Sequence, residues 1–174
     1  AGGESLAEVG LTQPEVPPAR GFAIQARVNM ERMLADGEVR PSGGVLHRFD
    51  PPSGPGVRVD SYGYAGYATN PNFDSLLAKV IAHAPSADFE ETIARARRAL
   101  NEFGIDGVDT NLGFLQTALA HPDFACGEIS TAWVDAHWDE LVEEESGDAT
   151  VPATPDSGFA GAQLDTRDPL AGLN

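Results

Sequence analysis

Three polar residues alternate with apolar ones along one stretch of this chain, and together they could bind an anion. Residues 21–29 read Gly-Phe-Ala-Ile-Gln-Ala-Arg-Val-Asn, so a strand here places Gln25, Arg27 and Asn29 on one face. A guanidinium between two amides, anchored by an apolar back face, is a platform for an anionic ligand. The alternative is a solvated strand face on which Arg27 pairs with a neighbouring carboxylate. The pattern alone leaves both interpretations open.

The other reactive groups show no motif that names a reaction. Cys126 is the only cysteine, which excludes a disulfide within the chain and a cysteine-based zinc site. Lys79, the only lysine, either lies with its stem along an apolar element or pairs with a carboxylate such as Asp74, and we favour pairing. The histidines lie far apart without ligand spacing, so we predict surface or turn positions and no metal site for His47, His83, His121 and His137.

Charge and hydropathy limit the kinds of partner that the chain is expected to bind. The chain has 27 acidic and 11 basic residues, a formal net charge of -16, so nucleic acid is not an expected partner. No stretch is apolar enough to cross a membrane, so we expect no membrane partner. The single cysteine favours a cytoplasmic location. The start, Ala1-Gly2-Gly3-Glu4, has no methionine, basic segment or apolar run, so we expect a segment of a longer chain.

Strands are expected mainly in the first half of the chain. Alternation predicts strands over residues 21–29, 45–49 and 57–60. Residues 76–83 form a buried strand or a helix, and propensity does not decide between them. Residues 30–38 are expected to form a loop or a short helical turn, and the Tyr- and Gly-rich residues 62–67 a strand, a bend or the edge of a pocket.

Helices are expected in the second half. The clearest runs from Asp88 to Phe103, with Asp88 and Glu91 as a capping box and Gly104 as its stop. Its arginines either form an anion patch or pair with acidic neighbours, and we favour pairing. Residues 105–110 are expected to be a link and 123–128 a loop. Further helices are predicted over residues 111–120 and from Ser130 or Thr131 onward, the last with an apolar face of Trp133, Val134, Trp138 and Leu141.

Strands followed by helices predict an α+β fold, an antiparallel sheet with helices on one face or end. We divide the chain into the end of a preceding helix and a connector (1–19), the folded domain (20–145) and an acidic flexible linker toward a following domain (146–174). Residues 4–9 are the expected helix end.

Several stretches, in one order, resemble biotin carboxylases, and the resemblance covers about residues 20–140. Residues 21–29 resemble the family's GHAIEARIN segment, with Gln25 where the family has glutamate. The other matching stretches are Pro41–Gly44, Gly54–Ser61, Tyr64–Tyr67, Phe73–Val80, Ile105–Asn111 and Phe124–Val134. The resemblance implies the C-terminal domain of an ATP-grasp biotin carboxylase, which uses ATP, Mg or Mn and bicarbonate to carboxylate biotin on a carrier protein.

The resemblance also implies roles for individual residues. Arg27 matches the arginine that holds bicarbonate and stabilises the biotin enolate, and Asp74 matches the acidic residue that orients it. Arg58 matches a position at the subunit interface of bacterial members, where Pro55 replaces an aromatic residue. Thr131 matches a position that borders the adenine of ATP. The family's ATP-grasp lysines, glycine-rich lid, metal-binding glutamates and catalytic base have no match here, so this segment alone is expected to be inactive.

Two hypotheses follow from the resemblance. In the first, the chain supplies the arginine of a biotin carboxylase site within a multifunctional acyl-CoA carboxylase, with a biotin carrier domain, a carboxyltransferase domain and further copies of the chain as partners. In the second, it is a scaffold or oligomerisation domain of a biotin-dependent carboxylase, and its arginine is unused.

Overall fold

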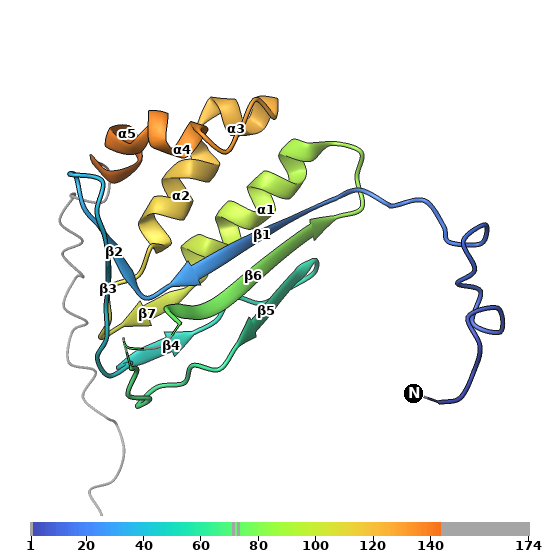
Figure 1. Ribbon diagram of the computed structural model, residues 1–174, viewed down its shortest axis with the longest axis horizontal. Helices are drawn as coiled ribbons and strands as arrows, with labels where there is room; N and C mark the ends of the chain where they lie inside the picture. The colour runs from blue at the N-terminus through green and yellow to red at the C-terminus, as the bar shows by residue number, and fades with distance from the viewer. Residues whose placement is uncertain (1, 71, 73, 144–174) are drawn as a thin grey trace, which may run out of the picture.

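Three antiparallel strands form the central sheet, in the order β1–β6–β5 (Figure 1). They are β1 (Phe22–Asn29), β6 (Leu76–Ala84) and β5 (Val57–Ser61). The computed structural model describes residues 2–70, 72 and 74–143. Cross-strand register places Arg27 opposite Lys79 and Lys79 opposite Asp60. Because directly paired residues share a face of the sheet, these three side chains form one row.

The opposite face of the sheet is apolar and is covered by helices. Ala26, Val28, Val80 and Ala82 are buried in the core cluster that also contains Leu100 of α1 (Phe89–Glu102). Figure 1 shows α1 and α2 (Leu112–Ala120) on this side of the sheet, which confirms the predicted α+β arrangement.

The structure corrects one detail of the predicted strands and decides another that the sequence left open. Phe22 is not buried as predicted: at the start of β1 it remains 42% exposed and packs edge-on against Phe89. Residues 76–83 form a strand, not a helix, because buried side chains alternate with Lys79, Ile81 and His83 on the outer face.

The helix α1 confirms the predicted range from Asp88 to Phe103, which are its N-cap and C-cap residues, but two details at its ends differ. Asp88 is the N-cap and accepts a hydrogen bond from the Glu90 amide, but Glu91 pairs with Arg95 instead of completing a capping box. This ion pair agrees with the predicted solvated, paired face. Gly104 is not a helix stop; it begins a strand. A Cβ on Gly104 would lie 2.6 Å from Cζ of Arg48, so a larger residue here would displace the guanidinium of that side chain.

Short strand pairs flank the sheet, each in a place where none was fully predicted. The strand β2 (Glu31–Met33) lies within the expected loop at 30–38, and β3 (Val39–Pro41) follows that loop. The strand β7 (Gly104–Asp106) occupies part of the expected link at 105–110. Within the expected strand at 45–49, Val45 forms an isolated bridge to Ala68. Strand β2 pairs with β3, and β4 (Arg48–Asp50) pairs with β7, both in antiparallel orientation. Residues 62–67 form a turn region with tyrosine rings packed edge to face.

The last helices pack over the end of α2 (Figure 1). The expected loop at 123–128 contains the short helix α3 (Pro122–Cys126), and the expected third helix is divided into α4 (Trp133–Ala136) and α5 (Trp138–Glu143). The predicted apolar face is confirmed: Trp133 and Leu141 are buried in a second core cluster, and Val134 and Trp138 pack against it.

The N-terminal residues do not form the helix end that was predicted for 4–9. They form turns, and Gly10 has a φ of 67°. The predicted linker, 146–174, lies outside the described residues. Within the described part of the chain, no helix combines the length and apolarity needed to cross a bilayer.

Candidate active site

Arg27 lies on the open face of β1, held by two neighbours. Its Nη2 donates to Oδ1 of Asp74 at 2.5 Å, and its Nε donates to Oδ1 of Asn29 at 2.9 Å. A guanidinium has five N–H donors, and these contacts use two of them. Within the described residues the other three have no protein partner, and the side chain is 46% exposed. Arg27 is therefore oriented by the protein while donors remain for a ligand.

Asp74 is the orienting carboxylate, and it is held in its turn by the backbone. The Leu76 amide donates to the same Oδ1 at 2.9 Å. This hydrogen bond, followed by the one from Arg27 and the nearby charge of Lys79, lowers the pKa of Asp74 from its ordinary value. Asp74 thus stays ionised at neutral pH. Arg27 is paired with a carboxylate, as the solvated-face interpretation predicted. It also keeps donors without a partner among the described residues, as an anion-binding platform requires.

A buried amide that the sequence analysis did not single out fixes the end of β1. Asn111, 8% exposed, accepts from the amide of Asn29 at 2.8 Å and donates to the carbonyl of Arg27 at 3.2 Å. Asn29 also donates to Glu31, whose carboxylate accepts from Ser75. Asn111 is a positioning residue for Arg27. The only available signal was its place at the end of the Ile105–Asn111 stretch, where it was taken as a helix start.

The predicted pairing of Lys79 with a carboxylate such as Asp74 is wrong. Among the described residues, no carboxylate lies within ion-pair distance of its ammonium group, because Asp74 binds Arg27 and Asp60 binds Arg58 at 2.9 Å. Lys79 is half-buried directly across from Arg27. Arg27 and Lys79 therefore place two cationic groups side by side on this face, which favours an anionic ligand.

The structure brings together two of the four predicted site residues. Arg27 and Asp74 are in contact, whereas Arg58 lies on β5 with its side chain 73% exposed. Thr131 lies in the turn before α4 and is exposed. Within the described residues, neither Arg58 nor Thr131 forms a hydrogen bond or ion pair with Arg27 or Asp74.

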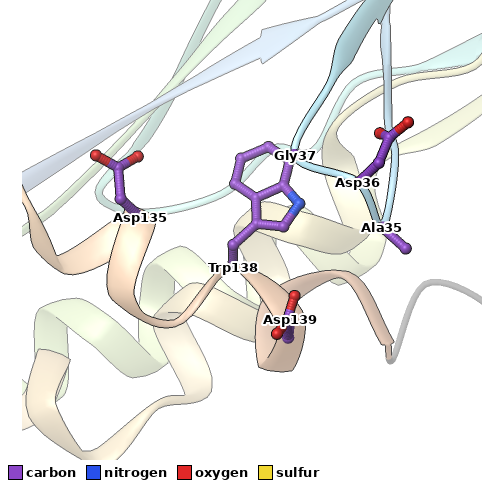
Figure 2. Close-up of a pocket in the computed structure, with 6 residues that line it drawn as sticks. All are labelled: Ala35, Asp36, Gly37, Asp135, Trp138 and Asp139. Atoms are coloured by element: carbon purple, nitrogen blue, oxygen red, sulfur yellow. The ribbon is translucent and has the colours of Figure 1, made fainter.

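A separate hollow of about 310 Å³ lies between the β2–β3 hairpin and the last helices (Figure 2). Trp138 lies beside it and donates through its indole N–H to the carbonyl of Leu34 at 2.8 Å. The other lining residues include three carboxylates, from Asp36, Asp135 and Asp139. Their negative charge disfavours an anionic substrate, so we do not place the active site here.

The predicted separation of the histidines is correct for only part of the set. His47 and His83 are exposed, as expected. His121 and His137, although sixteen positions apart, lie with ring centroids 5.0 Å from each other and beside Asp123.

Comparison with known proteins shows the family to which the domain that carries Arg27 and Asp74 belongs. The family model of the biotin carboxylase C-terminal domain matches residues 25–136, and the chain belongs to that family. Biotin carboxylase 1 of Bacillus subtilis is 40% identical over 130 residues, which are 75% of this chain and 28% of that protein. The chain therefore spans little more than a quarter of this relative's length.

Solved structures agree with this assignment. A single-chain, multi-domain long-chain acyl-CoA carboxylase matches with a TM-score of 0.74 and 44% identity, over 82% of this chain and 15% of that one. The biotin carboxylase domain dimer of the Hydrogenobacter thermophilus 2-oxoglutarate carboxylase, solved with MgADP, ADP and bicarbonate, matches with a TM-score of 0.65 and 34% identity, over 70% of this chain and 26% of that one.

Proposed function

We propose that this chain supplies the arginine of a biotin carboxylase site, which uses ATP and bicarbonate to carboxylate biotin. The observation that supports this most is Arg27: it is held at two nitrogens, it has donors without a partner among the described residues, and it stands beside Lys79. Planar, bidentate donors fit the oxygens of bicarbonate and the ureido oxygen of biotin. ATP supplies the phosphoryl group that activates bicarbonate when it is bound.

Arg27 would act where negative charge develops. In the carboxylation step, a base outside this chain would take the proton from N1 of biotin, which leaves negative charge on the ureido oxygen. N1 would then form a bond to the carbon that comes from bicarbonate, while the bond from that carbon to the phosphate oxygen breaks and phosphate leaves. The free N–H donors of Arg27 would bind the ureido oxygen, and Asp74 and Asn29 would keep the guanidinium from turning away. Donors arranged in advance stabilise such charge without reorganisation.

The described residues fit the anionic groups better than the nucleotide or its metal ion. Lys79 is the single lysine, and it stands beside Arg27. No phosphate-binding glycine loop was found in the sequence. We therefore propose that Mg or Mn and the phosphates of ATP are bound mainly by residues outside this chain, and that Thr131 borders the adenine.

We further propose that the chain works within a cytoplasmic, biotin-dependent acyl-CoA carboxylase, with a biotin carrier domain and a carboxyltransferase domain as partners. The 44% identity to a long-chain acyl-CoA carboxylase supports this choice over pyruvate or 2-oxoglutarate as acceptor. Arg58, exposed on the edge strand β5, is proposed as a contact between copies of the chain. Transfer from carboxybiotin to acyl-CoAs of different length and to pyruvate would test the acceptor.

The test of the function is the rate of carboxylation of free biotin by the full-length protein. Arg27→Ala removes the proposed donor, and we expect a loss of about 10²–10³-fold. Arg40→Ala is the matched control, because Arg40 is an exposed arginine paired with Glu38 on β3, and it should leave the rate near that of the wild type. Equal rates for the wild type and Arg27→Ala would reject the proposal and favour a scaffold role.

A further inference from the structure

Three potential metal ligands meet at the helical end of the molecule, away from Arg27 and Asp74. His121 is the N-cap of α3, Asp123 lies in its first turn, and His137 lies between α4 and α5. Oδ2 of Asp123 is 3.7 Å from Nδ1 of His121 and 3.7 Å from Nε2 of His137. One ligand atom from each residue lies within 4.8 Å of the others.

Neighbouring groups orient each of these side chains. Nδ1 of His137 lies 2.9 Å from the carbonyl of Trp133, and because a carbonyl only accepts, Nδ1 carries the proton. In the neutral ring, Nε2 of His137 therefore presents its lone pair toward Asp123. The indole N–H of Trp133 donates to Oδ2 of Asp123 at 2.9 Å and fixes that carboxylate.

His121 has a looser arrangement. Its Nε2 lies 3.6 Å from Oε2 of Glu140, a contact longer than a hydrogen bond, and this carboxylate favours a proton on Nε2. Its Nδ1 then has the lone pair, which now accepts a long hydrogen bond, 3.2 Å, from the Asp123 amide. A carboxylate or carbonyl partner at the second nitrogen is typical of histidines that bind metals.

We propose that His121, Asp123 and His137 form a binding site for a divalent transition-metal ion of the zinc class. Bonds of about 2.0–2.1 Å in tetrahedral geometry place ligand atoms about 3.3 Å apart. The two contacts with Asp123 are 3.7 Å and all three ligand atoms lie within 4.8 Å of one another, so an ion would draw the three side chains together. Two imidazoles and one carboxylate favour zinc or cobalt over magnesium or calcium. The His121, His137 and Asp123 side chains are 20%, 25% and 39% exposed, which leaves a route for the ion and for water as a further ligand.

Aromatic packing accounts for part of the cluster but not for its polarity. Trp133 stacks on His137 with ring centroids 4.7 Å apart, and His121 contacts Trp133 edge-on at 5.0 Å. These contacts explain why the rings are close. They do not require a nitrogen of each imidazole to lie at the same distance from one carboxylate oxygen.

A bound ion would connect the start of α3 to the junction of α4 and α5. The residues between Asp123 and His137, 124–136, would then be closed at their base. Thr131 lies among these residues, so metal binding would restrict the segment that carries it.

The test is metal binding by the full-length protein, produced without a histidine tag, stripped with a chelator and free of nucleotide. Co²⁺ is added with excess Mg²⁺, and the visible absorption of protein-bound Co²⁺ is followed for the wild type, His137→Gln and Asp123→Asn. His47→Gln is the control, because His47 is an exposed histidine outside the cluster. We expect one saturable equivalent in the wild type and the control, displaced by Zn²⁺, and affinity weakened at least about tenfold in both cluster variants.

Equal Co²⁺ binding by the wild type and both cluster variants would overturn the proposal, as would the absence of a saturable signal in the wild type. A second measurement guards against misfolded variants. Zn²⁺ should raise the thermal unfolding temperature of the wild type, because an ion that binds only the folded state stabilises it. No such rise in the wild type would also contradict the site.

Discussion

The open face of the sheet and the helical end of the molecule both gather charged or titratable side chains, but by different means. On the sheet, strand pairing alone places Arg27, Lys79 and Asp60 in one row. At the helical end, His121, Asp123 and His137 meet because Trp133 contacts both imidazole rings and donates to the carboxylate. A strand pattern predicts the first kind of neighbourhood, since its period is two. The second depends on turns and short helices whose paths the sequence pattern does not define.

The packing beneath the two regions also differs. The sheet lies on the larger cluster, which includes Ala26, Val80 and Leu100, whereas the helical end has a smaller cluster that includes Trp133 and Leu141. We therefore expect the sheet to be the more stable support, and the variants below are chosen to test that difference.

The largest effect is expected from Leu100→Ala, in the core beneath the sheet. Leu100 is fully buried, and truncation removes its contacts and leaves a cavity, so the free energy of unfolding should fall by about 2–5 kcal/mol. Leu141→Ala, equally buried at the helical end, should cost less, because the short helices around it can close the gap. Guanidinium unfolding of both variants measures the two losses. A greater loss for Leu141→Ala would reverse the comparison.

Asp74→Asn tests how far the sheet face depends on orientation. The amide keeps an acceptor for Arg27 and Leu76 but loses the charge that strengthens both hydrogen bonds, so carboxylation of free biotin should slow by about tenfold. Glu38→Gln, which weakens the exposed pair with Arg40, is the control and should have no effect. An unchanged rate in Asp74→Asn would mean that Asn29 alone orients the guanidinium.

Trp133→Phe is the corresponding change at the helical end. Phenylalanine retains much of the ring packing but removes the N–H that holds Asp123, so the free energy of unfolding should fall by about 1 kcal/mol. Biotin carboxylation should be nearly unaffected, because Arg27 and Asp74 are not touched. A loss of activity as large as that of Asp74→Asn would show that the two regions are coupled.

The smallest effect is expected from Lys79→Met, which keeps an apolar stem and removes the positive charge of the ammonium group beside Arg27. The KM for bicarbonate should rise by about two- to fivefold with little change in kcat, because the charge attracts the anion without orienting it. Lys79→Arg should restore the wild-type value. A fall in kcat with unchanged KM would instead assign Lys79 to the chemical step.

The sequence predicted the α+β fold, β1 and α1, because these two elements have enough residues to show a period. It left β6 open between a strand and a helix, because its run of apolar residues fits both. It did not predict strands such as β2 and β7, which are three residues long and too short for alternation to be visible. The contact of Arg27 with Asp74 was anticipated from the resemblance to biotin carboxylases and not from spacing, since 47 positions separate them.

The residues that were missed depend on tertiary contacts. Lys79 has no carboxylate partner within the described residues because strand register places it beside Arg27, which already binds Asp74. Asn111 was taken as a helix start, and it is the N-cap residue of α2, but its side chain also reaches back to the end of β1. Neither relation has a signal in local composition.

The most direct test of the central claim is the amount of carboxybiotin formed per ATP cleaved by the full-length protein, for the wild type and Arg27→Ala, with bicarbonate and free biotin. If Arg27 stabilises the charge that develops on biotin, the variant should still cleave ATP while the yield of carboxybiotin per ATP falls sharply. If both rates match those of the wild type, Arg27 takes no part in the reaction and the domain is a scaffold.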